Sequence, residues 1–182
     1  MSRPLTQYFA ASSLDGFIAD EHDNLDWLLQ LEGGPAEDTN PYDDFIAQVG
    51  ALAMGATTYE WILRHDPGSW AYGDRRTWVF THRALTPFEG ADLVFTADDV
   101  AAVHADMLAA AAGRNVWLVG GGDLVGQFLD HGLLDEIWVS LAPVTLGGGA
   151  PFLPRRWTTP MTLLSVTGTP NSTFVHLRFS LR

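Results

Sequence analysis

The clearest chemical signal in this sequence is phosphate binding by glycines that follow a short apolar run. Residues 116–119 (Val-Trp-Leu-Val) lead directly into Gly120, Gly121, Gly122, Asp123 and Leu124. Glycines let a backbone turn sharply and approach a ligand, and a helix that starts there offers unpaired N–H groups to an anion. The GxGxxG dinucleotide pattern is only partly met, because Val125 stands at the third glycine. Taken alone, the segment fits a tight strand-to-helix connection equally well.

Two further apolar runs are followed by residues that could bind phosphate. Residues 51–54 are apolar and are followed by Gly55, Ala56, Thr57 and Thr58. Either threonine is expected to cap a helix that runs to about residue 64. Residues 77–80 are followed by Thr81, His82 and Arg83. A guanidinium suits a phosphate monoester, although a solvated loop with an ordinary surface arginine is the alternative.

The pattern of apolar runs predicts the elements that must position these segments. We expect strands at residues 5–11, 51–54, 77–81, 92–96, 116–119 and 136–141. Helices are expected at 42–50 with Gly50 as the stop, from the Asp98 cap to about 112, and at 123–131. Residues 20–41 are expected to form a long ordered loop. The last two strands, at 161–167 and 173–181, have no helix between them and are expected to pair antiparallel.

This alternation predicts an α/β fold with a mainly parallel twisted sheet, helices on both faces and an antiparallel C-terminal strand pair. The length of 182 residues fits a single domain spanning residues 1–182. Because the carboxyl ends of parallel strands meet at one edge of a sheet, the two glycine strand ends at Gly55 and Gly120 are expected to point the same way and bracket one nucleotide.

Composition excludes several classes of function. The net charge is −12 and there is no basic cluster, so nucleic acid is a poor partner. There is no cysteine, which removes disulfides and thiol nucleophiles. No apolar run approaches a membrane span and no signal pattern is present, so a cytoplasmic location is expected. No HxxxH or HxE spacing occurs and the acidic run at 20–26 lacks the glycine and glutamate of a calcium loop, so no metal site is expected.

The chain resembles the dihydrofolate-reductase-like family, most closely the branch similar to the reductase (C-terminal) domain of the riboflavin-biosynthesis deaminase-reductase. The resemblance spans nearly the whole chain in ordered segments. These are Ser13-Leu14-Asp15-Gly16-Phe17-Ile18-Ala19, Leu25-Asp26-Trp27-Leu28, Met54-Gly55-Ala56-Thr57-Thr58-Tyr59, Val119-Gly120-Gly121-Gly122 and residues 143–152 (PVTLGGGAPF).

The resemblance implies NADPH lying across the carboxyl ends of the parallel strands. Its nicotinamide would lie near Ala11 and Ile18, its phosphates at the helix starts after Gly55 and Gly120, and its 2′-phosphate at residues 81–83. Relatives often have a basic residue where Ala56 stands, which leaves the choice between NADPH and NADH open. True dihydrofolate reductases also place a carboxylate at the start of their first helix, and here the nearest acids are Asp26 and Asp43 or Asp44.

The remaining candidates come from the same region of the resemblance. Asp15, Asp26 and Ser140 are the candidates for catalysis, and Trp27, Tyr59 and Ile62 are candidates for lining a flat-ring substrate pocket. Asp15 is more simply the turn residue of Asp-Gly, and the aromatics are more simply core residues.

The sequence therefore predicts a stand-alone NADPH-dependent reductase of a small pterin-like or ribosylaminopyrimidine-like heterocycle, which we expect to form a homodimer. Two alternatives stay open. One is an NADP(H)-binding module or sensor without redox turnover, and the other is a structural or interaction domain that binds no nucleotide.

Overall fold

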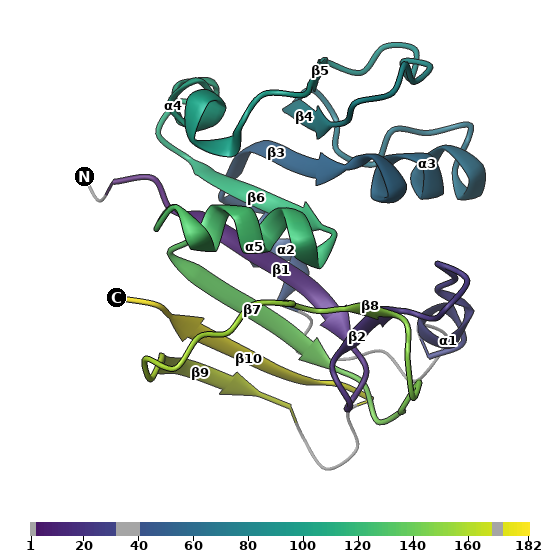
Figure 1. Cartoon of the computed structure of the whole chain (residues 1–182), viewed down its shortest axis with the longest axis vertical. Coiled ribbons are helices and arrows are strands. Elements are labelled where there is room, and N and C mark those ends of the chain that lie inside the picture. The colour runs from purple at the N-terminus through teal and green to yellow at the C-terminus, as the bar shows by residue number, and fades with distance from the viewer. Residues whose placement is uncertain (1–2, 32–40, 169–172) are drawn as a thin grey trace.

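The computed structural model describes residues 3–31, 41–168 and 173–182 (Figure 1). The strands are β1 (Thr6–Ser12), β2 (Phe17–Ala19), β3 (Val49–Gly55), β4 (Arg76–Phe80), β5 (Leu93–Thr96), β6 (Asn115–Gly120), β7 (Glu136–Leu141), β8 (Ala150–Pro151), β9 (Thr162–Thr167) and β10 (Val175–Ser180). The helices are α1 (Asp26–Leu29), α2 (Tyr42–Ala47), α3 (Ala56–His65), α4 (Val100–Ala110) and α5 (Gly122–Asp130). None of these helices is long and apolar enough to cross a bilayer.

Eight strands form one mixed sheet in the order β5-β4-β3-β6-β1-β7-β10-β9. All pairs from β5 to β7 are parallel, whereas β10 pairs antiparallel with both β7 and β9. The carboxyl ends of the parallel strands point to the same side, on the right in Figure 1, where α1 and β2 also lie. The predicted α/β class, parallel sheet and antiparallel C-terminal pair are confirmed.

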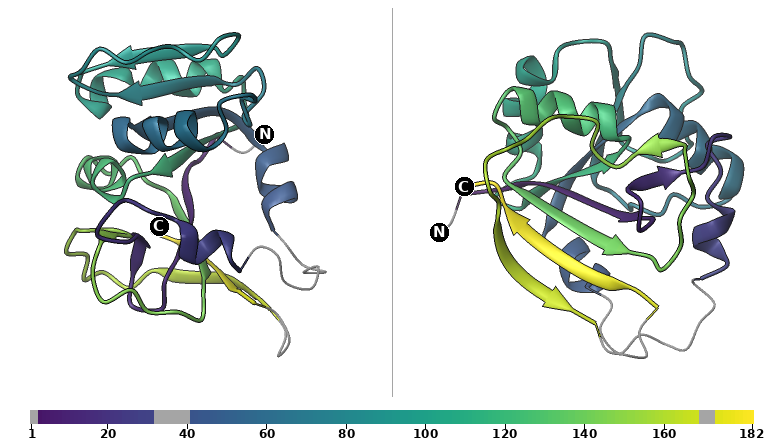
Figure 2. Two further views of the ribbon diagram at one scale, coloured as in Figure 1. Left: turned by 90° about the vertical axis from the view of Figure 1, so that its right-hand side faces the viewer. Right: turned by 60° about the horizontal axis from the view of Figure 1, so that its bottom comes forward.

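Helices cover both faces of the sheet, as Figure 2 shows from two further sides. On one face α4 and α5 bury Val103, Met107 and Phe128 among strand residues such as Tyr8 and Leu118. On the other face α2 and α3 bury Phe45, Tyr59 and Ile62 against Phe9, Leu52 and Trp117. The central strands are apolar on both sides because both of their faces are covered.

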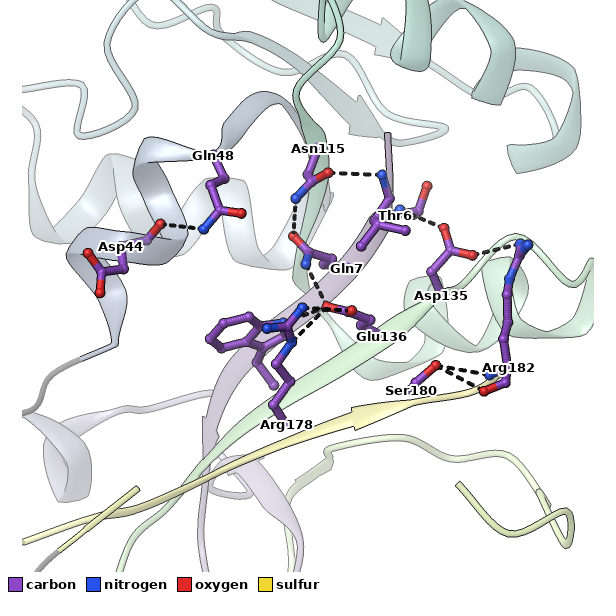
Figure 3. Close-up of polar contacts among 12 residues, drawn as sticks. Thr6, Gln7, Asp44, Gln48, Asn115, Asp135, Glu136, Arg178, Ser180 and Arg182 are labelled. Carbon is purple, nitrogen blue, oxygen red and sulfur yellow. Dashed lines mark hydrogen bonds and ion pairs between the residues drawn. The ribbon is translucent and has the colours of Figure 1, made fainter. Parts of the chain in front are cut away.

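A buried polar network lies at the opposite end of the strands, where β1, β6 and β7 begin (Figure 3). The Gln7 amide donates to Glu136 at 2.7 Å and accepts from Asn115 at 3.0 Å. Arg178 donates to both Glu136 oxygens, at 3.1 and 2.8 Å. Its guanidinium also lies 4.6 Å from the ring centroid of Trp138. Every charge in this network is paired, so it joins neighbouring strands without leaving a buried ion unpaired.

Four local expectations were wrong. Asp99, not Asp98, caps α4, because its side chain accepts the N–H of Ala101. Neither threonine caps α3, whose N-cap is Gly55 without a side-chain bond. Gly50 does not stop α2 but lies inside β3, where any Cβ would overlap the Ala111 backbone. The loop expected at 20–41 contains the short helix α1, and its residues 32–40 lie outside the described chain.

Candidate functional site

A cleft of about 910 Å³ opens at the carboxyl ends of the parallel strands. It is lined from the ends of β4 and β5, past the starts of α3 and α5, to β1, β2 and α1. Ligands of open α/β sheets bind at this edge, because backbone N–H groups of the following helices point there. Because its lining comes from several different elements, the cleft offers different surroundings to different parts of a ligand.

The middle of the cleft is built from two glycine strand ends. A Cβ on Gly55 would lie 3.8 Å from the Gly121 nitrogen, so the ends of β3 and β6 are in contact distance of each other. The N-termini of α3 and α5 therefore open side by side. Gly121 has extended angles (φ −77°, ψ 177°), and a Cβ built there would meet no atom within 4 Å. This is an open cradle at a helix start.

Gly122 has a different role from its neighbour. It is buried, and a Cβ there would overlap the carbonyl oxygens of Pro151 and Phe152, which cross the first turn of α5. Arg155 then lies over Gly126, one turn further along the same helix. The glycines of α5 thus admit the segment around β8 onto the helix, and Pro151 brings that segment to the cleft.

Asp123 lines the cleft in the first turn of α5. Hydrogen bonds from Gln127 and Arg155 hold the pKa of its carboxyl below the ordinary value. Arg155 lies 3.0 Å from Asp123 and 2.8 Å from Asp130. The negative charge beside the helix start is therefore partly compensated by an arginine that does not itself line the cleft.

The end of the cleft at β4 and β5 is polar. Thr81 and His82 line it after β4, and residues 96–99 line it after β5. Asp98 accepts a hydrogen bond from the Thr96 hydroxyl at 3.0 Å, and Asp99 is the helix cap. Arg83 is turned to Glu60 in a two-bond ion pair, at 3.0 and 2.8 Å, and is not among the lining residues.

The other end of the cleft is apolar. Ala11 and Ile18 line it from β1 and β2, and Leu25 and Leu28 from the segment of α1. Three residues on the α3 side complete it, namely Trp61, Ile62 and Tyr72. Tyr72 is nearly fully buried, and burial raises the pKa of its hydroxyl, which stays protonated. This end suits the flat faces of aromatic rings.

Most of the residues predicted to contact a cofactor line this one cleft. They are Ala11, Ile18, Gly55, Ala56, Thr57, Thr58, Thr81, His82, Gly120, Gly121, Gly122, Asp123 and Leu124. Of the predicted substrate residues, Ile62 lines it as well. The sequence order of these segments gave no distance between them, and the sheet brings them together.

The three residues proposed for catalysis do not line the cleft. Asp15 accepts the N–H groups of Leu146 and Gly147 and the hydroxyl of Ser13, which lowers its pKa. Asp26 is exposed and accepts from Asn24 at 2.8 Å. Ser140 is buried in the sheet and lies 2.7 Å from His176 Nδ1. Asp15 is thus the turn residue of the simpler interpretation.

Trp27, Tyr59 and Arg83 also lie outside the lining. The Tyr59 side chain is fully buried, and its hydroxyl donates to the Thr86 carbonyl at 2.8 Å and accepts from Phe88 N–H. It anchors the segment after β4 instead of facing a ligand. The aromatic residues that do line the cleft near α3 are Trp61 and Tyr72.

Sequence reasoning missed several lining residues. Thr96 ends β5, and Ala97, Asp98 and Asp99 follow it just as Thr81 and His82 follow β4, so the same strand-end rule would have found them. Ala150 and Pro151 belong to the matching segment 143–152 but had no predicted role, and Tyr72 had no signal in the sequence, because long-range packing brings all three to the cleft. Within the described ranges no group of three or more His, Asp or Glu residues is arranged to hold a metal ion.

Comparison with known proteins gives a relative and several solved structures. The chain is 34% identical over 146 residues to the uncharacterized protein YwjB of Bacillus subtilis (strain 168), covering 80% of each protein. It resembles the crystal structure of a putative riboflavin biosynthesis protein from Shewanella sp. PV-4, with a TM-score of 0.75, 23% identity and coverage of 98% and 99%.

Two more distant structures share the fold. The first is a diaminohydroxyphosphoribosylaminopyrimidine deaminase/5-amino-6-(5-phosphoribosylamino)uracil reductase from Thermotoga maritima, with a TM-score of 0.69 and 15% identity. The match covers 98% of this chain but 56% of that protein. The second is a dihydrofolate reductase from Enterococcus faecalis complexed with NADP(H), with a TM-score of 0.60, 15% identity and coverage of 97% and 94%.

The family comparison is the most direct of these findings. Residues 4–173 match the model described as the RibD C-terminal domain, which is nearly the whole chain. The likeness to YwjB and the shared fold agree with that match. The chain therefore belongs to the RibD C-terminal domain family.

Proposed function

We propose that this protein is a reductase that uses NADPH to reduce a small flat heterocycle. The observation that carries the proposal is the single cleft in which two adjacent helix starts, at Gly55 and Gly121, lead to an apolar end at Ala11 and Ile18. Family membership and the NADP(H) complex of the structurally similar dihydrofolate reductase support it.

The residues present fit a dinucleotide. The open space at Gly121 leaves room for a diphosphate at the N-termini of α3 and α5, where N–H groups and helix dipoles favour negative charge. The Thr81 hydroxyl and His82 would contact the 2′-phosphate, and Arg83 would join them by exchanging Glu60 for that phosphate. When bound, NADPH supplies the hydride, and the protein supplies binding and orientation.

The apolar end of the cleft would hold the two reacting rings against each other. Ala11, Ile18 and Leu28 would exclude water from them, and Trp61 and Tyr72 would flank the acceptor. The one carboxylate among the described lining residues from β2 to α1 is Asp23, at the same end of the cleft. The acceptor would gain a hydride from the bound dinucleotide and a proton from water, which would leave NADP⁺ and a ring reduced by two electrons.

The test has two stages. Quenching of the fluorescence of the seven tryptophans measures binding of NADPH and of NADH. Loss of NADPH absorbance is then followed with pterins, flavin precursors and quinones as acceptors. Tight binding followed by turnover supports the proposal. Binding without turnover on any acceptor favours a nucleotide-binding module, and the lack of any nucleotide binding refutes both.

A further inference from the structure

No arginine side chain lines the cleft, although Arg83 lies next to the lining residues Thr81 and His82. The sequence contains ten arginines and no lysine, and every arginine belongs to the described residues. None of them is among the residues that line the cleft. Segments 32–40 and 169–172 contain no arginine, lysine or histidine in their sequence. The usual side chains that bind phosphate are therefore missing from the described walls.

Three arginines are held at the far end of the strands. Arg178 is paired with Glu136, and Arg3 and Arg182 are both paired with the buried carboxylate of Asp135. Figure 3 shows Arg178 and Arg182 in this network, where β7 begins. Because β7 runs from this network toward the cleft, its whole length separates these cations from the site.

The remaining arginines are also engaged elsewhere or lie outside the lining. Arg75 donates to the backbone carbonyls of Ile46, Val49 and Tyr72. Arg83 is paired with Glu60, and Arg155 with Asp123 and Asp130. The other four, which are also absent from the lining, are Arg64, Arg76, Arg114 and Arg156.

The cleft nevertheless has two features that would bind phosphate, and in the proposed function the dinucleotide occupies both, with Arg83 joining the second from outside the lining. The N-termini of α3 and α5 serve its diphosphate, and Thr81 and His82 lie at the β4 end, far along the lining from β2. At the acceptor end the walls are Ile18, Leu25 and Leu28, and the charged lining residue there is Asp23. A second phosphate at this end would meet apolar carbon and a carboxylate.

We propose that the acceptor carries no phosphate and is an uncharged or cationic planar ring. The inference rests on the proposed function, because it assigns the acceptor end of the same cleft. It separates this chain from the Thermotoga maritima protein, whose name gives it a phosphoribosyl substrate. Desolvating a phosphate dianion without a cation is costly, whereas an aromatic ring gains from the same apolar walls.

The experiment compares acceptors that differ only by a phosphate. Riboflavin and FMN form one pair, and a ribosylaminopyrimidinone and its 5′-phosphate form another. Calorimetric titration of the protein saturated with NADP⁺ gives the affinity for each. We expect the unphosphorylated member to bind at least about tenfold more tightly. Equal or tighter binding of the phosphorylated member overturns the inference, and so does the failure of every ring to bind.

A substitution at Asp23 provides the second arm. Asp23 has φ +56°, a conformation that asparagine tolerates, so Asp23→Asn removes the charge without strain. The ratio of the affinities for the unphosphorylated and the phosphorylated member of each pair should fall by up to about fivefold, because one nearby like charge has been removed. Asp106→Asn, which removes an exposed charge on α4 outside the lining, should leave this affinity ratio unchanged. An unchanged affinity ratio in Asp23→Asn would show that this carboxylate does not repel a phosphate on the acceptor.

The two levels of the proposal fail differently. If the wild-type protein binds neither NADP⁺ nor NADPH, the proposed function fails. If it binds the dinucleotide but prefers phosphorylated rings, the function stands and the inference about the acceptor is wrong.

Discussion

Adjacent glycines at the start of α5 offer the sharpest test of the site. Gly121 faces open space in an extended conformation that any residue adopts. Gly122 is buried beneath the carbonyl oxygens of Pro151 and Phe152. Gly121→Ala and Gly122→Ala therefore add the same methyl group at neighbouring positions, but only the first methyl group points into the cleft.

The first substitution should lower the affinity for NADPH, and the second should lower the stability of the fold. Gly121→Ala should leave the free energy of unfolding unchanged or raise it by up to about 1 kcal/mol, because alanine restricts the unfolded chain. The same methyl group would occupy the space that we assign to the diphosphate, so NADPH affinity should fall at least about tenfold, or about 1.4 kcal/mol. Gly122→Ala should lower the free energy of unfolding by about 1–3 kcal/mol through overpacking.

Thermal unfolding and NADPH titration separate these outcomes. For a chain of this size each kcal/mol shifts the Tm by about 2–4 °C, so Gly122→Ala should unfold several degrees earlier than the wild type. Gly121→Ala should keep the wild-type Tm or raise it by up to about 4 °C, and its affinity for NADPH should fall at least about tenfold. If Gly121→Ala binds NADPH normally, the diphosphate does not lie at the start of α5 and the assignment is refuted.

Two further predictions concern charge. Arg83→Ala should lower the affinity for NADPH about tenfold and leave the affinity for NADH unchanged, because only NADPH carries the 2′-phosphate. Equal losses of affinity for both would show that Arg83 does not contact that phosphate. His104 lies 2.8 Å from Thr6 Oγ1, and burial lowers its pKa from 6.5, so the unfolded chain takes up the proton first. The free energy of unfolding should thus be highest above pH 6.5 and fall as the pH drops below it. His104→Gln should make the free energy of unfolding, measured by urea titration, fall less steeply below pH 6.5. An unaltered pH profile would show that His104 does not cause the decline.

Much of the fold followed from short-range patterns. The alternation of apolar runs with helical segments required parallel strands, and parallel strands must end at one edge. The glycines at 55 and 120–122 marked where that edge would bind an anion. The predicted strand directions and the shared edge are confirmed, because chain direction and helix starts are local properties that residues close in sequence determine. Anion binding at that edge stays a prediction.

The sequence alone misjudged side chains whose surroundings are distant in the chain. Tyr59 and Tyr72 are both aromatic and near the same helix, but Tyr59 is enclosed by residues 86–88 and Tyr72 reaches the cleft. Arg83 follows two lining residues yet turns to Glu60. Asp15 follows the first strand yet anchors residues 146 and 147.

By itself, then, the sequence determined the family of this protein and the edge of the sheet at which the glycine strand ends meet, because glycines, strand ends and motif order are local features of a sequence. Only the tertiary structure decided which charges face the cleft. The partners of Arg155, Arg178 and Arg182 are carboxylates on α5 and at the start of β7, and pairing with them keeps the cations out of the site. An ion pair depends on where two distant segments meet, and that is a property of packing rather than of spacing.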